Sequence, residues 1–104
     1  KMKVFIIQSI DRKLSFEDIA DSKGIEVSDV IGEVEAIVNS GTKLNIDYYI
    51  EDVIDEDHQE DIFEYFREAE TDSIQDALDE LGEEEYSEDD IRLMRVKFFS
   101  DLGN

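Results

Sequence analysis

The sequence contains no cysteine, no proline and no long apolar run, and each absence excludes a class of structure. Without cysteine, the chain has no disulfide, no thiolate zinc site and no cysteine nucleophile. Without proline, helices can run to their natural caps. The apolar runs fall short of the roughly 20 residues that a membrane-spanning helix needs, and no signal-peptide pattern opens the chain. We therefore expect a soluble, cytoplasmic protein that makes no contact with a membrane.

Basic side chains are also few. The 104 residues carry 30 Asp and Glu against 10 Lys and Arg, which gives a formal net charge of −20. Affinity for nucleic acid comes mainly from neutralising phosphates with Lys and Arg, so this balance argues against a generic phosphate-binding surface. The chain is nevertheless 40% hydrophobic and includes 6 Phe and 4 Tyr. That apolar content predicts a folded chain with a core rather than a disordered acidic tail.

The charge divides a single predicted domain, residues 1–104, into two halves. Residues 1–50 hold 6 basic and 9 acidic side chains, a net charge of −3, whereas residues 51–104 hold 4 and 21, a net charge of −17. Only the first half could approach a polyanion, although its basic residues could equally be scattered solubilising charges. The candidates for weak phosphate contacts are Lys3, Arg12, Lys13 and Lys43.

Hydrophobic spacing predicts a mainly α fold in the first half. Residues 2–10 are apolar almost all round a helical wheel, which predicts a central helix, with a buried strand as the alternative. Ser15 and Gly24 bound a short helix, because serine accepts hydrogen bonds from the first amides and glycine tolerates positive φ. Ser28 and Gly41 bound the next helix in the same way.

The rest of the chain predicts one short strand and three additional acidic helices. Apolar and polar residues alternate over residues 44–50, which predicts the strand. The first of these helices begins at the acidic residues 55–57, whose charge the helix dipole favours, and the other two begin with caps at Ser73 or Asp72 and at Ser87. In the last helix, apolar residues occupy two opposite faces. We expect it to pair with the first helix at the centre of the domain, and the alternative is an exposed docking patch. The candidate interaction residues of that patch are Leu93, Val96 and Phe99.

The two capped helices of the first half form a predicted helix-turn-helix. Ile19 and Ala20 face the following helix, and Gly24 allows the sharp turn between the two. Three segments carry a resemblance to a known family: LSFEDIADSKGIEVSDVIGEVEAIVNSG, then LNIDYYI, then a closing YSEDDIRLMRVKF. Together they resemble the C-terminal helix-turn-helix domain of bacterial RecQ-type ATP-dependent DNA helicases. The resemblance runs from about Phe5 to Gly103.

The resemblance implies an accessory domain, a fragment of a longer helicase that unwinds DNA in repair and recombination with ATP and magnesium. The chain has no phosphate loop ending in Gly-Lys-Ser/Thr and no Asp-Glu-x-His box. We therefore expect no ATP hydrolysis, no catalytic residue and no bound cofactor in the fragment itself. The implied partners are the helicase core or another protein, with DNA reached through the parent enzyme. The alternative is a stand-alone acidic interaction module, or a DNA mimic, unrelated to any helicase.

The second helix of the pair has unsuitable charges for reading DNA. A recognition helix presents Arg, Lys, Asn or Gln to base edges. The corresponding positions here include Asp29, Glu33 and Glu35, whose carboxylates would repel a duplex. A wing would also need a two-stranded hairpin after Gly41, and one strand is predicted there, so the fold is degenerate winged-helix-like. We expect Asp29 and Glu33 to contact protein rather than DNA.

The acidic run over residues 55–61 is not predicted to bind a metal. A calcium loop needs glycine at its sixth position, where Glu60 stands. His58 is the only histidine, and one imidazole among carboxylates does not make a catalytic centre. Arg92 and Arg95, on the last helix, are expected to pair with neighbouring acids at a gain of roughly 0–1 kcal/mol.

Overall fold

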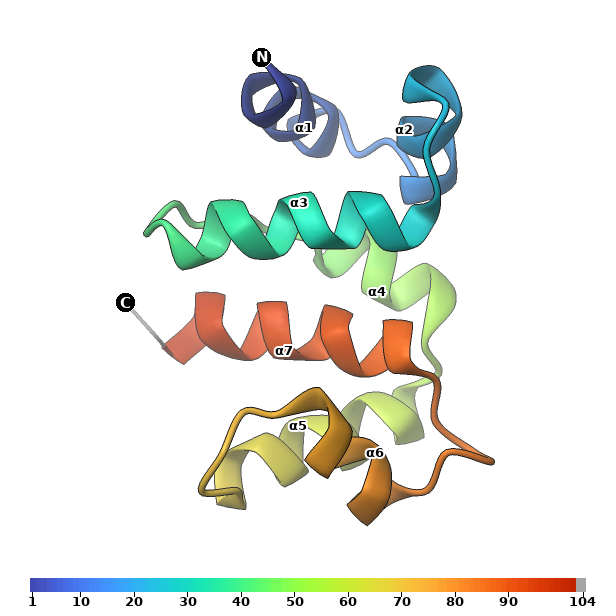
Figure 1. The fold of residues 1–104 in the computed structure, drawn as a ribbon, viewed down its shortest axis with the longest axis vertical. Helices are drawn as coiled ribbons and strands as arrows, with labels where there is room; N and C mark the ends of the chain where they lie inside the picture. Colours follow the sequence, from blue (N-terminus) through green and yellow to red (C-terminus); the bar gives the residue numbers. More distant parts are fainter. Residues whose placement is uncertain (103–104) are drawn as a thin grey trace.

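Seven helices make up the regular structure of residues 1–102, the part of the chain that the computed structural model describes (Figure 1). In chain order they are α1 (Met2–Asp11), α2 (Phe16–Lys23), α3 (Val27–Asn39), α4 (Asp47–Val53), α5 (Glu56–Glu68), α6 (Ile74–Leu81) and α7 (Glu88–Leu102). The predicted mainly α fold is confirmed, and residues 2–10 are helical rather than extended. Gly103, where the family resemblance ends, lies outside the described residues. Within residues 1–102, no helix is both long and apolar enough to cross a membrane.

Helices α2 and α3 form the predicted helix-turn-helix. Ser15 begins α2, because its Oγ accepts a hydrogen bond from the backbone N–H of Asp18 at 3.0 Å. Gly24 ends α2 with a φ of 65°, in the left-handed region that favours glycine. Across the turn, the N–H of Ile25 donates to the carbonyl of the buried Ala20 at 3.0 Å. The turn therefore has the geometry that its sequence predicts.

Helix α3 begins earlier than its predicted cap. Glu26 is the N-cap, and its side chain and that of Asp29 each accept a hydrogen bond from the other's backbone N–H in a capping box. The prediction that Ser28 caps this helix is wrong. A reciprocal pair of carboxylates satisfies the free amides at the helix start, and Ser28 is left exposed within the first turn.

The strand predicted over residues 44–50 is wrong, because α4 begins at Asp47 and the described residues contain no strand. The buried side chains here are not those of a simple alternation. Ile46, Tyr49 and Ile50 are each at most 3% exposed, and their spacing is that of one helix face. Residues 1–102 therefore have no hairpin wing after α3.

The three acidic helices begin where the sequence predicts. Ser73 and Ser87 each accept a hydrogen bond, at 3.1 Å, from the backbone N–H three residues further on, as predicted. Asp55, expected only to supply charge, also caps its helix by accepting a hydrogen bond from the N–H of His58 at 2.9 Å. Of the two candidates for the cap of α6, Ser73 rather than Asp72 is the one used. Local side-chain chemistry therefore sets the start of each helix in the acidic half.

Helices α3 and α7 lie side by side at the centre of the molecule (Figure 1). Helices α1 and α2 pack on α3, whereas α4, α5 and α6 pack on α7. The predicted central pair of first and last helices is therefore wrong in one member, because α3 rather than α1 is the partner of α7. Val30, Ile31 and Val34 of α3 and Ile91 and Met94 of α7 are at most 1% exposed. One apolar core thus joins the two halves of the chain.

Candidate functional site

The solvent-facing stripe of α3 carries two of the candidate interaction residues. Asp29 and Glu33 recur with the exposed Ala36 and Ser40 at helical spacing. Asp29 is exposed, and its carboxylate also holds the N–H of Glu26 at 3.0 Å. Helix α3 contains no Lys or Arg. A phosphate approaching this stripe therefore meets two carboxylates of α3 and no basic side chain of that helix.

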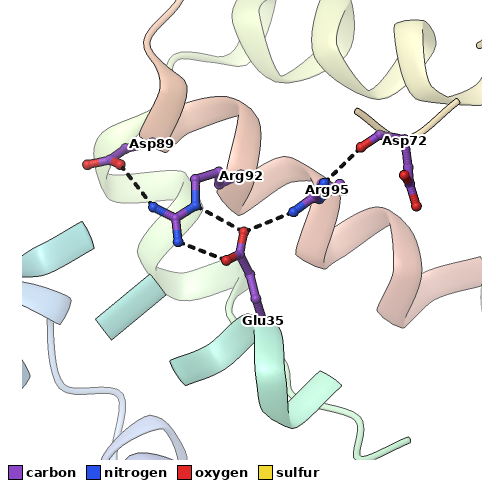
Figure 2. A network of polar contacts seen from close by, with 5 residues as sticks. All are labelled: Glu35, Asp72, Asp89, Arg92 and Arg95. Carbon is purple, nitrogen blue, oxygen red and sulfur yellow. Dashed lines mark hydrogen bonds and ion pairs between the residues drawn. The ribbon is translucent and has the colours of Figure 1, made fainter. Parts of the chain in front are cut away.

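Beside the stripe, Glu35 joins α3 to α7 through two arginines (Figure 2). Its carboxylate accepts hydrogen bonds from Nη2 and Nε of Arg92 at 2.8 and 3.0 Å, and from Nη2 of Arg95 at 3.2 Å. Nη1 of Arg95 also donates to the backbone carbonyl of Asp72 at 2.8 Å, and Asp89 lies 3.8 Å from Nη1 of Arg92. The cluster therefore fastens α3, α7 and the segment before α6 in one arrangement. A bidentate arginine fixes orientation as well as distance.

The Glu35 cluster is largely shielded from water. The side chains of Arg92, Glu35 and Arg95 are 15%, 17% and 21% exposed. Burial alone raises the pKa of Glu35, but the hydrogen bond and charge of Arg92, with those of Arg95, outweigh it and lower the pKa below its ordinary value. The hydrogen bond to Glu35 in turn raises the pKa of Arg92. Glu35 is therefore ionised at neutral pH, and the attraction between α3 and α7 persists there.

Helix α7 lies alongside α3 (Figure 1). A Cβ added at Gly32 of α3 would lie 3.5 Å from Nη2 of Arg92, which shows how closely the α7 arginine approaches the α3 backbone. A recognition helix presents Arg, Lys, Asn or Gln to the base edges in the major groove. The acidic stripe of α3 therefore opposes the reading of DNA by this helix.

The long-range contact of the two arginines with Glu35 was not predicted from the sequence. Arg92 and Arg95 were expected to pair locally, and this is wrong for their main partner, Glu35, which lies 57 and 60 residues away. The local contact is the one between Arg92 and Asp89. Two arginines three residues apart on a helix that is apolar on both sides are a signal for a shielded carboxylate. The sequence does not indicate which of 30 acidic residues supplies it.

The predicted docking patch on α7 is not an exposed surface. Leu93 and Val96 are each 2% exposed, and Phe99 is partly buried against the core. Helix α7 packs on α3 along one side and on α5 and α6 along another, which covers both of its apolar faces. The structure therefore favours the expected internal position of these three residues over the exposed docking patch.

The basic candidates are divided between different surfaces. Lys13 and Lys43 line one groove beside α1, together with three carboxylates, whereas Lys3 and Arg12 are exposed outside it. Two ammonium groups among three carboxylates give the groove a net negative charge. The structure thus brings two of the four residues together, in surroundings that do not favour a phosphate.

His58 has structural partners. Its Nε2 lies 3.1 Å from the carboxylate of Glu85, and its ring centroid lies 4.4 Å from the ring centroid of Tyr86. The Tyr86 hydroxyl donates to Asp61 at 2.6 Å. These contacts connect the beginning of α5 to the segment before α7.

In the part of the chain that the structure describes, no group of three or more His, Cys, Asp or Glu side chains is placed to hold a metal ion.

Comparison with known families agrees with this helix arrangement. Residues 1–50 match the family model described as "RecQ-1-like, helix-turn-helix domain". The match covers α1, α2 and α3 and ends within α4. None of the curated proteins matches the chain. Over residues 1–50, the chain is therefore similar to the RecQ-1-like helix-turn-helix domain.

Proposed function

We propose that the chain is the C-terminal accessory domain of a RecQ-like ATP-dependent DNA helicase, and that it docks a protein or the helicase core rather than reading DNA. The family match of residues 1–50 supports the first part. The observation that carries the second part is the position of α3. Its exposed stripe is acidic, and the Glu35 cluster holds α7 along its side.

The chemistry of unwinding belongs to the parent enzyme in this proposal. ATP and magnesium bind in its helicase core, and DNA is reached through that core during repair and recombination. The accessory domain supplies no catalytic residue and no cofactor ligand. Its contribution is a surface that positions a partner relative to the core.

The test compares the parent helicase with a form that lacks these residues. Deletion should leave the affinity for forked DNA and the DNA-dependent ATPase rate within about twofold, because the domain supplies no basic contact surface. Equilibrium titration with labelled forked DNA and a steady-state ATPase assay measure the two quantities. A loss of DNA affinity of about tenfold or more on deletion would contradict the proposed role.

A stand-alone acidic module is the rival function, and the net charge of −17 on residues 51–104 favours it. Such a module would attract a basic partner or imitate a phosphate backbone without any helicase. The complete reading frame separates the two. A frame that encodes a Gly-Lys-Ser/Thr phosphate loop and an Asp-Glu-x-His box supports the helicase, and a frame with neither supports the module.

A further inference from the structure

A groove of about 500 Å³ lies between α5 and α6. Both helices pack on α7 rather than closely on each other, which leaves their facing sides accessible. The floor of this α5–α6 groove consists of the partly buried side chains Tyr65, Ala69 and Leu81. Apolar surface between two helices is the kind of site into which a third, amphipathic helix packs.

The rim of the α5–α6 groove is acidic. Oε2 of Glu64 lies 3.5 Å from Nη2 of Arg67 on the same helix, and both of these side chains are more than half exposed. Within the described residues, Glu68 and Glu80 have no ion-pair partner. The four rim carboxylates are those of Asp61, Glu64, Glu68 and Glu80.

Two other grooves differ from this one because basic side chains line them. The groove between α5 and α7 contains Lys97, and the groove beside α1 contains Lys13 and Lys43. No described Lys or Arg lines the α5–α6 groove. Burial, followed by the negative charges of the acidic side chains of α6, raises the pKa of Tyr65 on the groove floor. The cations that Glu68 and Glu80 lack can be supplied by a bound partner.

We propose that the α5–α6 groove is the docking site for a partner protein that presents a basic amphipathic helix. An apolar side chain of that helix packs on Tyr65 and Leu81, and its Lys or Arg side chains pair with Glu68 and Glu80. A helix without basic residues would desolvate these carboxylates and leave them unpaired, which opposes its binding. This assignment rests on the proposed docking function and names the class of partner.

The test uses a fluorescein-labelled helical peptide of Leu, Lys and Ala, and a counterpart in which Gln replaces each Leu. Fluorescence anisotropy measures the affinity of the 104-residue chain for both peptides at about 150 mM NaCl, where long-range attraction is screened. The Leu peptide should bind about tenfold or more tightly than the Gln peptide, because only the Leu peptide covers the groove floor.

Two double variants with the same change in net charge locate the site. Glu68→Lys with Glu80→Lys reverses the rim, whereas Asp21→Lys with Asp52→Lys reverses exposed charges on α2 and α4. All four positions lie towards helix C-termini, where lysine is compatible with the helix dipole, so both variants should fold. Affinity for the Leu peptide should fall about tenfold for the first variant and by less than about twofold for the second.

Equal losses in the two variants, or equal binding of the two peptides, would overturn the groove assignment, because either result indicates general attraction to a negative chain. Neither result bears on the proposed docking function. That function fails by a different measurement, a loss of DNA affinity when the domain is deleted from the helicase.

Discussion

At the residue scale, Glu35 combines three hydrogen bonds to arginines with a side chain that is 17% exposed. A shielded carboxylate of this kind is stable only while its cationic partners are present, because an unpaired charge in such surroundings costs desolvation free energy. Exposed ion pairs of this protein lack that shielding and are screened by water. The stability of the α3–α7 contact should therefore depend on this cluster far more than on the surface pairs.

Replacing Arg92 should show this dependence. Arg92→Ala should lower the free energy of unfolding by about 2 kcal/mol, because Glu35 loses its bidentate partner while it stays shielded. Arg67→Ala is the matched control, because Arg67 is 55% exposed and 3.5 Å from the exposed Glu64. The control should lose less than about 1 kcal/mol. Urea unfolding followed by circular dichroism measures both, and equal losses would contradict a special role for the cluster.

Glu35 should also affect the pH dependence of stability. Its pKa in the folded protein is below the ordinary value of 4.5. The contribution of the Glu35 charge to the free energy of unfolding is therefore complete above its ordinary pKa. That contribution is lost as the pH falls through the lower pKa of the folded state. Glu35→Gln removes the contribution at every pH. The difference in free energy of unfolding between the two proteins should be present near pH 7 and shrink towards about pH 3.

The comparison with Glu35→Gln is needed because other groups titrate in the opposite sense. Burial raises the pKa of Asp90, so that residue favours the folded state more as the pH falls. Asp90 is common to both proteins and cancels in the difference. Urea unfolding at several pH values gives the difference directly. A difference that stays constant down to about pH 3 would show that the Glu35 charge does not stabilise the fold.

At the element scale, six of the seven helices could be predicted, whereas α4 was wrongly predicted as a strand. Ser15, Ser73 and Gly24 act on amides or dihedral angles within a few residues, so the sequence indicates their roles directly. The alternation over residues 44–50 is ambiguous, because its buried members also fit one turn of helix. A strand there would need a partner for its backbone groups, and none exists in residues 1–102.

The same substitution at two glycines should have opposite effects. Gly24→Ala places a Cβ at a φ of 65° and should destabilise the protein by about 1 kcal/mol. Gly32→Ala lies within α3, where the new Cβ meets Nη2 of Arg92 at 3.5 Å, an ordinary contact. It should stabilise the protein by up to about 1 kcal/mol through helix propensity. Thermal unfolding should rank Gly32→Ala above the parent chain and Gly24→Ala below it, and the reverse order would contradict the assigned turn and helix.

At the scale of the whole molecule, composition predicts the sign of the surface charge but not which helices pack together. Apolar residues on two faces of α7 indicate that it is enclosed, and Leu93 and Val96 are buried as the internal alternative requires. The partner of α7 could not be predicted, because the contact with α3 depends on side chains such as Glu35 that are far apart in sequence. The acidic groove between α5 and α6 arises from packing on α7 and has no sequence signal of its own.

The most direct measurement is a titration of the 104-residue chain against forked, duplex and single-stranded DNA at low and at physiological salt. The central claim is that a helix-turn-helix flanked by α7, with an acidic exposed stripe, does not read nucleic acid. We predict no saturable binding to any of the three at physiological salt, and at most weak binding at low salt that added salt abolishes. Binding at about micromolar concentration or tighter that survives physiological salt would contradict the claim.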